Sequence, residues 1–310
     1  MIFPIYQEKL FSSQEVSTQY RFTCLTLGNT GLGKETVLQL ARHRPARIYL
    51  AARTALKAEN AIASIQRALS ESETGSADIR YIPLDLASFA SIRAAAERFR
   101  SECDRLDTLI LNAGVMANMP ALTEEGFELH MGTNHIGHFL LTKLLLPTLR
   151  ATASESDSDV RVITLSSVAA NSAPSYEVMT STSALMATGW PTQYGASKAA
   201  NVLFASELAR RYPEIKSVSV HPGAVGTDLY QHSKQAGVVY EWGVNLGMNF
   251  FRSVRTGALT QVWAAGTERE ELVNGGYYIP IGVRGVSQYE GDEDMAKAFW
   301  EWTESQLSSI

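Results

Sequence analysis

Two side chains four residues apart, Tyr194 and Lys198, form the pair in this sequence that is best suited to proton transfer. The apolar residues that follow them recur at three- and four-residue spacing, which predicts a helix beginning near Tyr194. On a helix the two side chains lie on one face, about one turn apart. A positive charge beside a phenol lowers the pKa of the phenol from its usual value of about 10. The pair could therefore act as a general acid and base near neutral pH, although an amphipathic surface helix would explain it equally well if the pair stood alone.

A glycine-rich turn lies near the N-terminus, between a strand-like run at 22–27 and a helical pattern that starts near Thr36. The turn has the sequence Gly28-Asn29-Thr30-Gly31-Leu32-Gly33. Glycines permit a tight turn and let a phosphate approach the backbone, and a helix N-terminus carries partial positive charge. The order of strand, turn and helix favours a dinucleotide site over an ordinary turn.

Short β-branched runs alternate with helical patterns of ten to twenty residues along the chain, which predicts β-α-β units and a parallel sheet. No linker or change of composition divides the chain. We therefore expect residues 1–310 to form one Rossmann-type, doubly wound α/β domain with a seven-stranded parallel sheet flanked by helices, and residues 1–20 to form an extended arm. The strands are expected at 22–27, 47–52, 79–84, 106–111, 160–165 and 217–220. Helices are expected over 88–99, with Ser88 as a plausible cap, and over 128–149.

Polar residues and glycines follow the C-terminal end of nearly every expected strand. Ligands bind at this edge of open parallel sheets, so these residues are expected to line one site. The second strand ends at Ala52-Arg53, without a carboxylate to accept from a ribose 2′-hydroxyl. A guanidinium is suited to a phosphate, which favours a 2′-phosphorylated dinucleotide, unless Arg53 contacts only solvent. The strand-end residues are Gly28 to Gly33, Arg53, Asp85, Asn112 to Gly114, Ser167, Pro222 and Gly223.

Composition excludes several classes of partner and site. The chain has 27 basic and 32 acidic residues, a net charge of −5, so it offers no basic field for nucleic acid. It has no run of eighteen apolar residues and no signal peptide pattern, so we expect a cytoplasmic protein without a membrane span. Cys24 and Cys103 are far apart and are expected to be inert thiols. His135 and His138 lie three apart without further ligands nearby, so no metal is predicted.

Taken together, these motifs resemble the short-chain dehydrogenase/reductase family over residues 22–282. The matching set also includes Asp85-Leu86, Asn134, Ser166-Ser167 and Tyr194-Gly-Ala-Ser-Lys198. Four stretches are similar to the branch that contains retinol dehydrogenases and WW-domain oxidoreductases. They are Asn29-Thr-Gly-Leu-Gly-Lys-Glu35, Asn134-His-Ile-Gly-His138, His221-Pro-Gly-x-Val-x-Thr227 and the tail near Phe299-Trp300-Glu301.

The resemblance implies an NADP(H)-dependent carbonyl reductase or alcohol dehydrogenase. Tyr194 would protonate the carbonyl oxygen and Ser167 would hold that oxygen by a hydrogen bond. Lys198 would bind the nicotinamide ribose and lower the pKa of Tyr194, and Asn134 would anchor a water that leads a proton to Lys198. The cofactor contacts implied in this way are Gly28, Asn29, Thr30, Gly31, Leu32, Gly33, Arg53, Asp85, Leu86, Asn112, Ala113, Gly114, Tyr194, Lys198, Pro222, Gly223, Val225 and Thr227.

Each of these residues also has a simpler explanation when it is taken alone. Asn134 could be a helix residue bonded to backbone, and Ser167 could cap a strand end. Asp85 and Thr227 could cap the helices that follow them, and Asn112 could belong to an ordinary turn. The chain also has Leu27 where the family has the first glycine of its turn. That difference bears on cofactor affinity, and it keeps open a nucleotide-binding protein without redox turnover, either an NADPH sensor or a non-redox cyclase.

Two segments, 168–193 and 228–255, correspond to the wall and lid of the substrate pocket in this family. Both contain many apolar and aromatic residues, and 168–193, which is also rich in Ser, Thr and Ala, is expected to be irregular. A wall of this kind suggests a bulky lipophilic ketone, aldehyde or alcohol as the substrate. The alternative is that these segments pack on the domain or on a partner, so a homodimer stays open.

Overall fold

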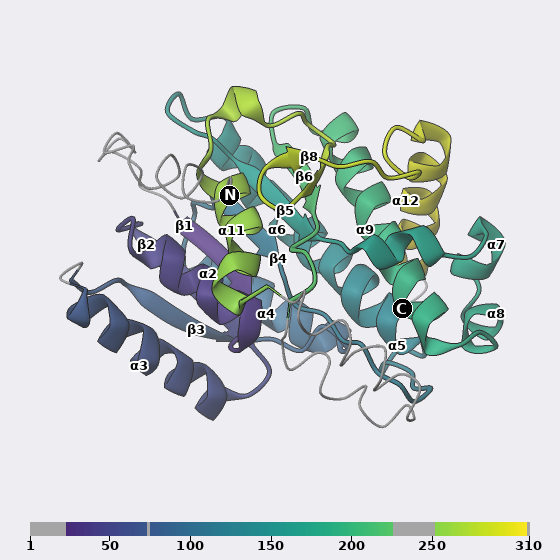
Figure 1. Ribbon diagram of the computed structural model, residues 1–310, viewed down its shortest axis with the longest axis horizontal. Coiled ribbons are helices and arrows are strands. Elements are labelled where there is room, and N and C mark those ends of the chain that lie inside the picture. The colour runs from purple at the N-terminus through teal and green to yellow at the C-terminus, as the bar shows by residue number, and fades with distance from the viewer. Residues whose placement is uncertain (1–22, 73–74, 226–251, 309–310) are drawn as a thin grey trace.

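The computed structural model describes residues 23–72, 75–225 and 252–308, and of residues 23–27 only the backbone. Its sheet has the strand order β3-β2-β1-β4-β5-β6-β7-β8 (Figure 1). The first seven strands are parallel, and β8 pairs antiparallel with β7. The strands are β1 Thr23–Leu27, β2 Arg47–Ala52, β3 Ile79–Pro83, β4 Thr108–Leu111, β5 Arg161–Leu165, β6 Lys216–Val220, β7 Tyr277–Ile279 and β8 Val283–Arg284.

The expected doubly wound class is therefore confirmed, with one strand more than the seven predicted. The additional strand, β8, has only two residues, both exposed, and it lies at the edge of the sheet. A run of two residues shows no alternation of apolar and polar positions, so no sequence pattern could reveal it.

The described helices are α2 Gly31–Ala41, α3 Ala55–Glu71, α4 Phe89–Glu102, α5 Leu129–Met131, the π-helical η1 Gly132–Ile136, α6 Gly137–Ala153, the 3₁₀ helix η2 Val168–Ser172, α7 Tyr176–Met179, α8 Thr182–Met186, α9 Trp190–Arg211, α11 Val254–Gly266, the 3₁₀ helix η6 Arg269–Glu271 and α12 Glu293–Ser308.

The helices cover both faces of the sheet and enclose two apolar cores. Alternate residues of one strand serve the two cores, because successive side chains of a strand point to opposite faces. In β2, Ile48 and Leu50 pack with residues of α2, α3 and α11, whereas Tyr49 and Ala51 pack with residues of α4, α6 and α9. Burial on both faces explains why the central strands are continuous apolar runs.

The helix that carries Tyr194 lies unusually close to the segment after β5, and a glycine makes this approach possible. A Cβ atom on Gly195 would lie 2.6 Å from the carbonyl oxygen of Ala169 and 2.6 Å from Oγ of Ser172, both in η2. The approach places the first turn of α9 beside the strand end that carries Ser167. Glycine at the second position of the Tyr-Gly-Ala-Ser-Lys stretch is thus a packing requirement.

The helix expected from Glu128 to Leu149 is present, but near its N-terminal end it contains a π-helical turn over Gly132–Ile136 that includes Asn134. Two glycines bound this turn. A Cβ on Gly132 would lie 2.3 Å from Cγ2 of Thr123, and one on Gly137 would lie 2.4 Å from the carbonyl oxygen of Leu86. Short π-helical turns often occur at functional sites. Sequence periodicity did not distinguish this turn from the α-helix around it.

The stretch 168–193 was expected to be irregular, and this expectation is wrong. It contains η2, α7, α8 and the first turn of α9. The first three of these elements have four or five residues each, too few for a helical period to appear in the sequence. Met179 and Leu185 are buried in the core, and the ring of Tyr176 packs on that of Phe299 in α12.

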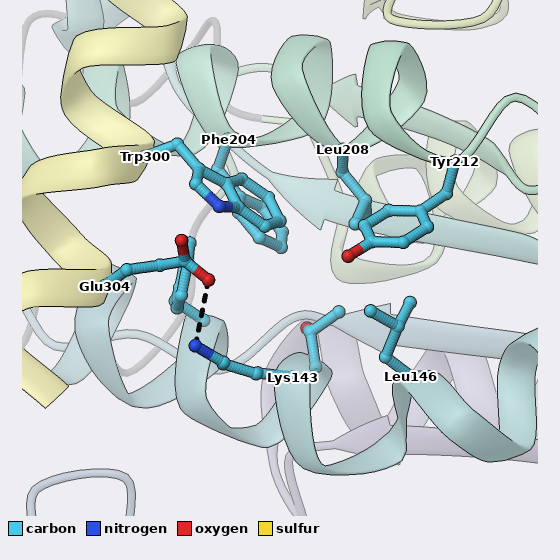
Figure 2. Close-up of a pocket in the computed structure, with 9 residues that line it drawn as sticks. Lys143, Leu146, Phe204, Leu208, Tyr212, Trp300 and Glu304 are labelled. Atoms are coloured by element: carbon cyan, nitrogen blue, oxygen red, sulfur yellow. Dashed lines mark hydrogen bonds and ion pairs between the residues drawn. The ribbon is translucent and has the colours of Figure 1, made fainter. Parts of the chain in front are cut away.

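The C-terminal helix α12 packs on α9 and α6 through aromatic side chains. The rings of Phe204 and Trp300 are stacked with centroids 5.8 Å apart (Figure 2). The guanidinium of Arg211 lies 4.9 Å from the centre of the Trp300 ring. Lys143 donates to Glu304 at 2.8 Å across the same interface. The hollow between them is only ≈ 50 Å³, and one water takes about 30 Å³ in the liquid.

No helix within residues 23–72, 75–225 and 252–308 is long and apolar enough to cross a membrane.

This packing predicts a stability role for Trp300, which is 5% exposed. We expect Trp300→Ala to lower the free energy of unfolding by about 3–5 kcal/mol, because the change removes buried aromatic area and leaves a cavity. Urea titration followed by circular dichroism measures the loss. Lys143→Ala is the control, since its exposed ion pair contributes about 0–1 kcal/mol. Equal losses of unfolding free energy in the two variants would contradict the stability role of Trp300.

Candidate active site

A cleft of ≈ 350 Å³ opens at the carboxyl ends of the strands. It brings together most of the residues that the sequence placed at strand ends. It also receives Ala87, Val115, Leu129 and Thr133, which were not predicted. The predicted residues that line it are Gly28, Asn29, Thr30, Gly31, Leu32, Arg53, Asp85, Leu86, Asn112, Ala113, Gly114, Tyr194, Lys198 and Pro222.

The glycine-rich turn is held tightly against Asn112 at the end of β4. Gly28 has φ +131°, which is unfavourable for residues with a side chain. A Cβ on Gly28 would lie 2.8 Å from Nδ2 of Asn112, and one on Gly33 would lie 2.7 Å from the same atom. Helix α2 begins at Gly31, directly after the bend. A bare backbone at a helix N-terminus fits a dinucleotide phosphate. The side chain of Leu27, which stands where the family has its first glycine, lies outside the described residues, so its effect on the turn stays a prediction.

Asn112 is more than a turn residue, because a distant helix also holds it. Gln261 of α11 donates from Nε2 to Oδ1 of Asn112 at 3.3 Å. The same amide of Gln261 donates to the hydroxyl of Thr36 in α2. Gln261 therefore connects the end of β4 to the first helix, and no local pattern in the sequence could indicate this.

Arg53 and Asp85 border the cleft at the ends of β2 and β3. Arg53 is exposed, and its guanidinium has no hydrogen bond or ion pair with any residue that the structure describes. Asp85 accepts from the backbone N–H of Ala87 at 2.9 Å. The cap of α4 is Ser88, as the sequence predicted, and its hydroxyl accepts from the backbone N–H of Ser91. The alternative of Asp85 as the helix cap is therefore wrong.

Tyr194 and Lys198 lie on one side of α9 and both line the cleft. The ammonium nitrogen of Lys198 is 5.6 Å from the centre of the Tyr194 ring. Lys198 is 4% exposed and donates to the carbonyl oxygen of Leu165 at 3.1 Å. Burial lowers the pKa of Lys198 to about 8. The side chain therefore stays mostly charged at pH 7, and its charge acts on the phenol through a medium that screens it little.

Asn134 uses its side chain to join two parts of the site. Its Oδ1 accepts from the backbone N–H of Val115 at 2.7 Å, and its Nδ2 donates to the carbonyl oxygen of Val115 at 3.0 Å and to Oγ of Ser197 at 3.0 Å. Ser197 in turn donates to the carbonyl oxygen of Tyr194 at 2.8 Å. The simpler reading, a helix residue bonded to backbone, is thus part of the observed geometry. The water-anchoring role stays a prediction.

The two serines after β5 have different partners. Ser166 is buried and donates from Oγ to the carbonyl oxygen of Lys198 at 2.7 Å. Ser167 accepts from the N–H of Ala169 at 3.2 Å and so caps η2. The hydroxyl proton of Ser167 has no acceptor among the described residues. Ser166 is among the residues that line the cleft and Ser167 is not, although Ser166 already uses its hydroxyl proton.

The segment after β6 is described only in part. Gly223 has φ +86°, and a Cβ there would lie 3.1 Å from Cγ of Pro280. Val225 is 3% exposed and pairs with Arg252 in an isolated bridge. Of the expected cofactor contacts, Thr227 lies outside the described residues, as does most of the segment 228–255. No described residue of 168–193 lines the cleft.

His135 and His138 are buried core residues. His135 bonds through Nε2 to Oγ1 of Thr303 at 3.0 Å, and His138 bonds through Nδ1 to the carbonyl oxygen of Asn134 at 2.9 Å. Burial lowers the pKa of both imidazoles to about 3. Within the described ranges, no group of three or more His, Cys, Asp or Glu side chains is placed to hold a metal ion. Cys103 is partly buried and donates to the carbonyl oxygen of Arg105 at 3.2 Å.

Comparisons with known proteins show the family to which this chain belongs. A family model described as short chain dehydrogenase matches residues 21–237. The chain is 40% identical over 287 residues to a short-chain dehydrogenase/reductase of Armillaria gallica, which covers 91% of this chain and 88% of that protein. It is 37% identical over 279 residues to retinol dehydrogenase 11 of Homo sapiens, covering 89% and 82%. The NADP complex of Pseudomonas aeruginosa RhlG has a similar structure, with a TM-score of 0.64 at 25% identity, covering 85% and 96%.

The burial of Lys198 leads to a prediction about stability and pH. The pKa of Lys198 is about 8 in the folded chain and 10.5 without burial, so folding releases a proton when the pH lies between these values. Below pH 8 the side chain stays charged in the folded chain, and its burial lowers the free energy of unfolding. We expect Lys198→Met to raise the free energy of unfolding at pH 7 by roughly 1–3 kcal/mol. The carbonyl of Leu165 keeps a donor, because Asn201 donates to it at 2.9 Å.

The gain should shrink as the pH rises from 8 toward 10.5, since the wild-type penalty disappears there. Urea titrations of both proteins at pH 7 and pH 10 measure the difference. Lys297→Met, which removes an exposed ammonium on α12, should change stability little at either pH. A Lys198→Met variant that is less stable than the wild type at pH 7 would overturn this reading.

Proposed function

The chain belongs to the short-chain dehydrogenase/reductase family, near the retinol dehydrogenases, and we propose that it is an NADP(H)-dependent oxidoreductase that interconverts a bulky lipophilic ketone or aldehyde and the corresponding alcohol. Family membership makes it an oxidoreductase that acts on a small molecule. The single observation that carries the finer proposal is the buried ammonium of Lys198, 5.6 Å from the Tyr194 ring in the cleft at the strand ends.

The residues present fit a dinucleotide, and the bound nicotinamide would supply or accept a hydride. In the direction of reduction, the phenol of Tyr194 donates its proton to the carbonyl oxygen as charge develops there. Lys198 stabilises the resulting phenolate by its charge. The hydroxyl of Ser167 donates a hydrogen bond to the same substrate oxygen, because its proton has no acceptor in the described part of the chain. In the direction of oxidation the phenolate takes the alcohol proton back.

Arg53 supports the phosphorylated form of the dinucleotide. It stands exposed at the rim of the cleft, directly after Ala52, so this strand end offers no carboxylate to a ribose 2′-hydroxyl. A guanidinium pairs well with a phosphate. The similar RhlG structure contains NADP, which agrees with this assignment.

The lipophilic substrate class rests on two features. One relative is named for retinol, a lipophilic alcohol, and the chain is 37% identical to it. The cleft that Tyr194 lines is also lined by the apolar side chains of Val115 and Leu129. The buried positions of Met179 and Leu185 assign these two residues to the core, so they do not contribute to the substrate argument.

The central test is Tyr194→Phe. We expect turnover to fall by at least a thousandfold while NADPH still binds, because only the transferable proton is removed. NADPH absorbance with a panel of lipophilic ketones, aldehydes and alcohols measures turnover, and NADPH fluorescence measures binding. Tyr176→Phe is the matched control, since its hydroxyl bonds to the carbonyl of Ala298 at 3.4 Å, away from the cleft. If wild-type protein binds NADPH but turns over no compound, a sensor or non-redox enzyme is the better proposal.

A second test concerns the cofactor phosphate. We expect Arg53→Ala to weaken NADPH binding about tenfold or more and to leave NADH binding nearly unchanged, because a charge-assisted contact to the phosphate is worth about 1.5–3 kcal/mol. Fluorescence titration with both nucleotides gives the ratio. Arg67→Ala removes the same charge from the exposed side of α3, away from the cleft, and should alter neither value. Equal losses for NADPH and NADH in Arg53→Ala would refute the phosphate role.

A further inference from the structure

A buried carboxylate and a buried imidazole lie directly behind the cleft, and the proposed reaction does not use them. Glu128 and His130 are each 1% exposed. Nδ1 of His130 lies 2.6 Å from Oε1 of Glu128. The carboxylate also accepts from the backbone N–H groups of His130 at 3.0 Å and Met131 at 2.8 Å, so it caps α5 as well. A buried carboxylate with three donors is a rigid support.

The partners of the imidazole determine which of its nitrogens carries the proton. Nε2 of His130 accepts from the backbone N–H of Ala117 at 3.0 Å. That nitrogen must therefore be unprotonated, and the proton must lie on Nδ1, facing Glu128. The carboxylate thus fixes both the tautomer and the orientation of the ring. A carboxylate often fixes the tautomer and the orientation of a functional histidine in this way.

The backbone that His130 holds is part of the wall of the cleft. The loop after β4 places Ala113, Gly114 and Val115 in the cleft. Asn134 binds this loop at Val115 from both its amide atoms, and His130 binds it two residues later, at Ala117. A Cβ on Gly114 would lie 3.2 Å from Oδ1 of Asn134 and 3.4 Å from Nζ of Lys198. The position of this loop therefore determines the space next to Lys198.

The same imidazole also contacts the general acid. The rings of His130 and Tyr194 meet edge to face, with centroids 6.1 Å apart and an angle of 76° between the planes. Such contacts are favourable and directional. The Tyr194 ring is thus in contact with the His130 ring, while the ammonium of Lys198 lies 5.6 Å from the centre of the Tyr194 ring.

We propose that His130, oriented by Glu128, is a positioning residue that holds the Tyr194 ring and the loop 112–117 in the geometry needed for proton transfer. The inference rests on the proposed function of Tyr194 as the acid and base. His130 does not itself donate a proton to the substrate, because its two nitrogens are bonded to Glu128 and Ala117. Its contribution is to restrict the phenol, and a displacement of about 1 Å in such a group can lower a rate about a hundredfold.

Two substitutions separate the two contacts of the ring. His130→Gln keeps an amide oxygen that can accept from Ala117, but it removes the ring beside Tyr194. His130→Phe keeps a ring beside Tyr194, but it leaves the N–H of Ala117 without its acceptor. His135→Gln is the matched control, because His135 is equally buried five residues later and bonds to Thr303 in α12.

The two variants should fail in different ways. We expect His130→Gln to lower kcat tenfold to a hundredfold, with the Kd for NADPH changed less than threefold and the kinetic pKa assigned to Tyr194 moved upward. We expect His130→Phe to raise the Kd for NADPH about tenfold, because the loop is released, with a smaller effect on kcat. His135→Gln should lower the thermal midpoint but leave kcat, Kd and the kinetic pKa unchanged.

A structural role alone would make kcat fall in proportion to the loss of stability in all three variants, and that result would overturn the proposal. Wild-type kcat and pKa in His130→Gln would overturn it as well. The titration of Tyr194 can also be followed without a substrate. It is measured as the phenolate absorbance of each protein minus that of its Tyr194→Phe form. An upward shift of that titration in His130→Gln supports the positioning role even if no carbonyl compound is turned over, a result that would count against the proposed function alone.

Discussion

The site depends on keeping one ammonium charged inside the protein. Lys198 is almost wholly buried, with the carbonyl of Leu165 as its hydrogen-bond acceptor and the ring of Tyr194 nearby. Removing a charge from water is costly when no opposite charge accompanies it. The cost appears as a lowered pKa for Lys198, about 8, which still leaves the group charged at neutral pH. The fold therefore supplies stability elsewhere so that this charge can act on a phenol.

Close packing of backbone makes this burial possible. Gly195 lets α9 approach η2, and Gly132 and Gly137 let the π-helical turn approach its neighbours. Each of these positions would clash with a Cβ atom, so the small residues are required by distance and not by chain flexibility. The result is that Asn134, on the π-helical turn, reaches the β4 loop and α9 together. A wider spacing between these elements would leave buried polar atoms without partners.

The polar interior is organised as a chain of supports behind the cleft. Glu128 orients His130, His130 holds Ala117, and Asn134 holds Val115 in the same loop. Gln261 holds the first residue of this loop, because it donates to Asn112. Because nearly every one of these groups is bonded, few protons or lone pairs are left to interact with a ligand. The hydroxyl proton of Ser167 and the guanidinium of Arg53 are among those that remain available within the described residues.

The sequence by itself determined the class of fold, most of the strand-end residues that line the cleft, and the placing of Tyr194 and Lys198 on one side of a helix. These follow from local periodicity and from residue types, which neighbours along the chain are enough to specify. It did not reveal β8, the short helices α7 and α8, or the π-helical turn, because each is too short to show a repeating pattern in the sequence. It also did not reveal the roles of Glu128, His130 and Gln261. Their partners are set by packing between segments far apart in the sequence, and only the tertiary structure decides those distances.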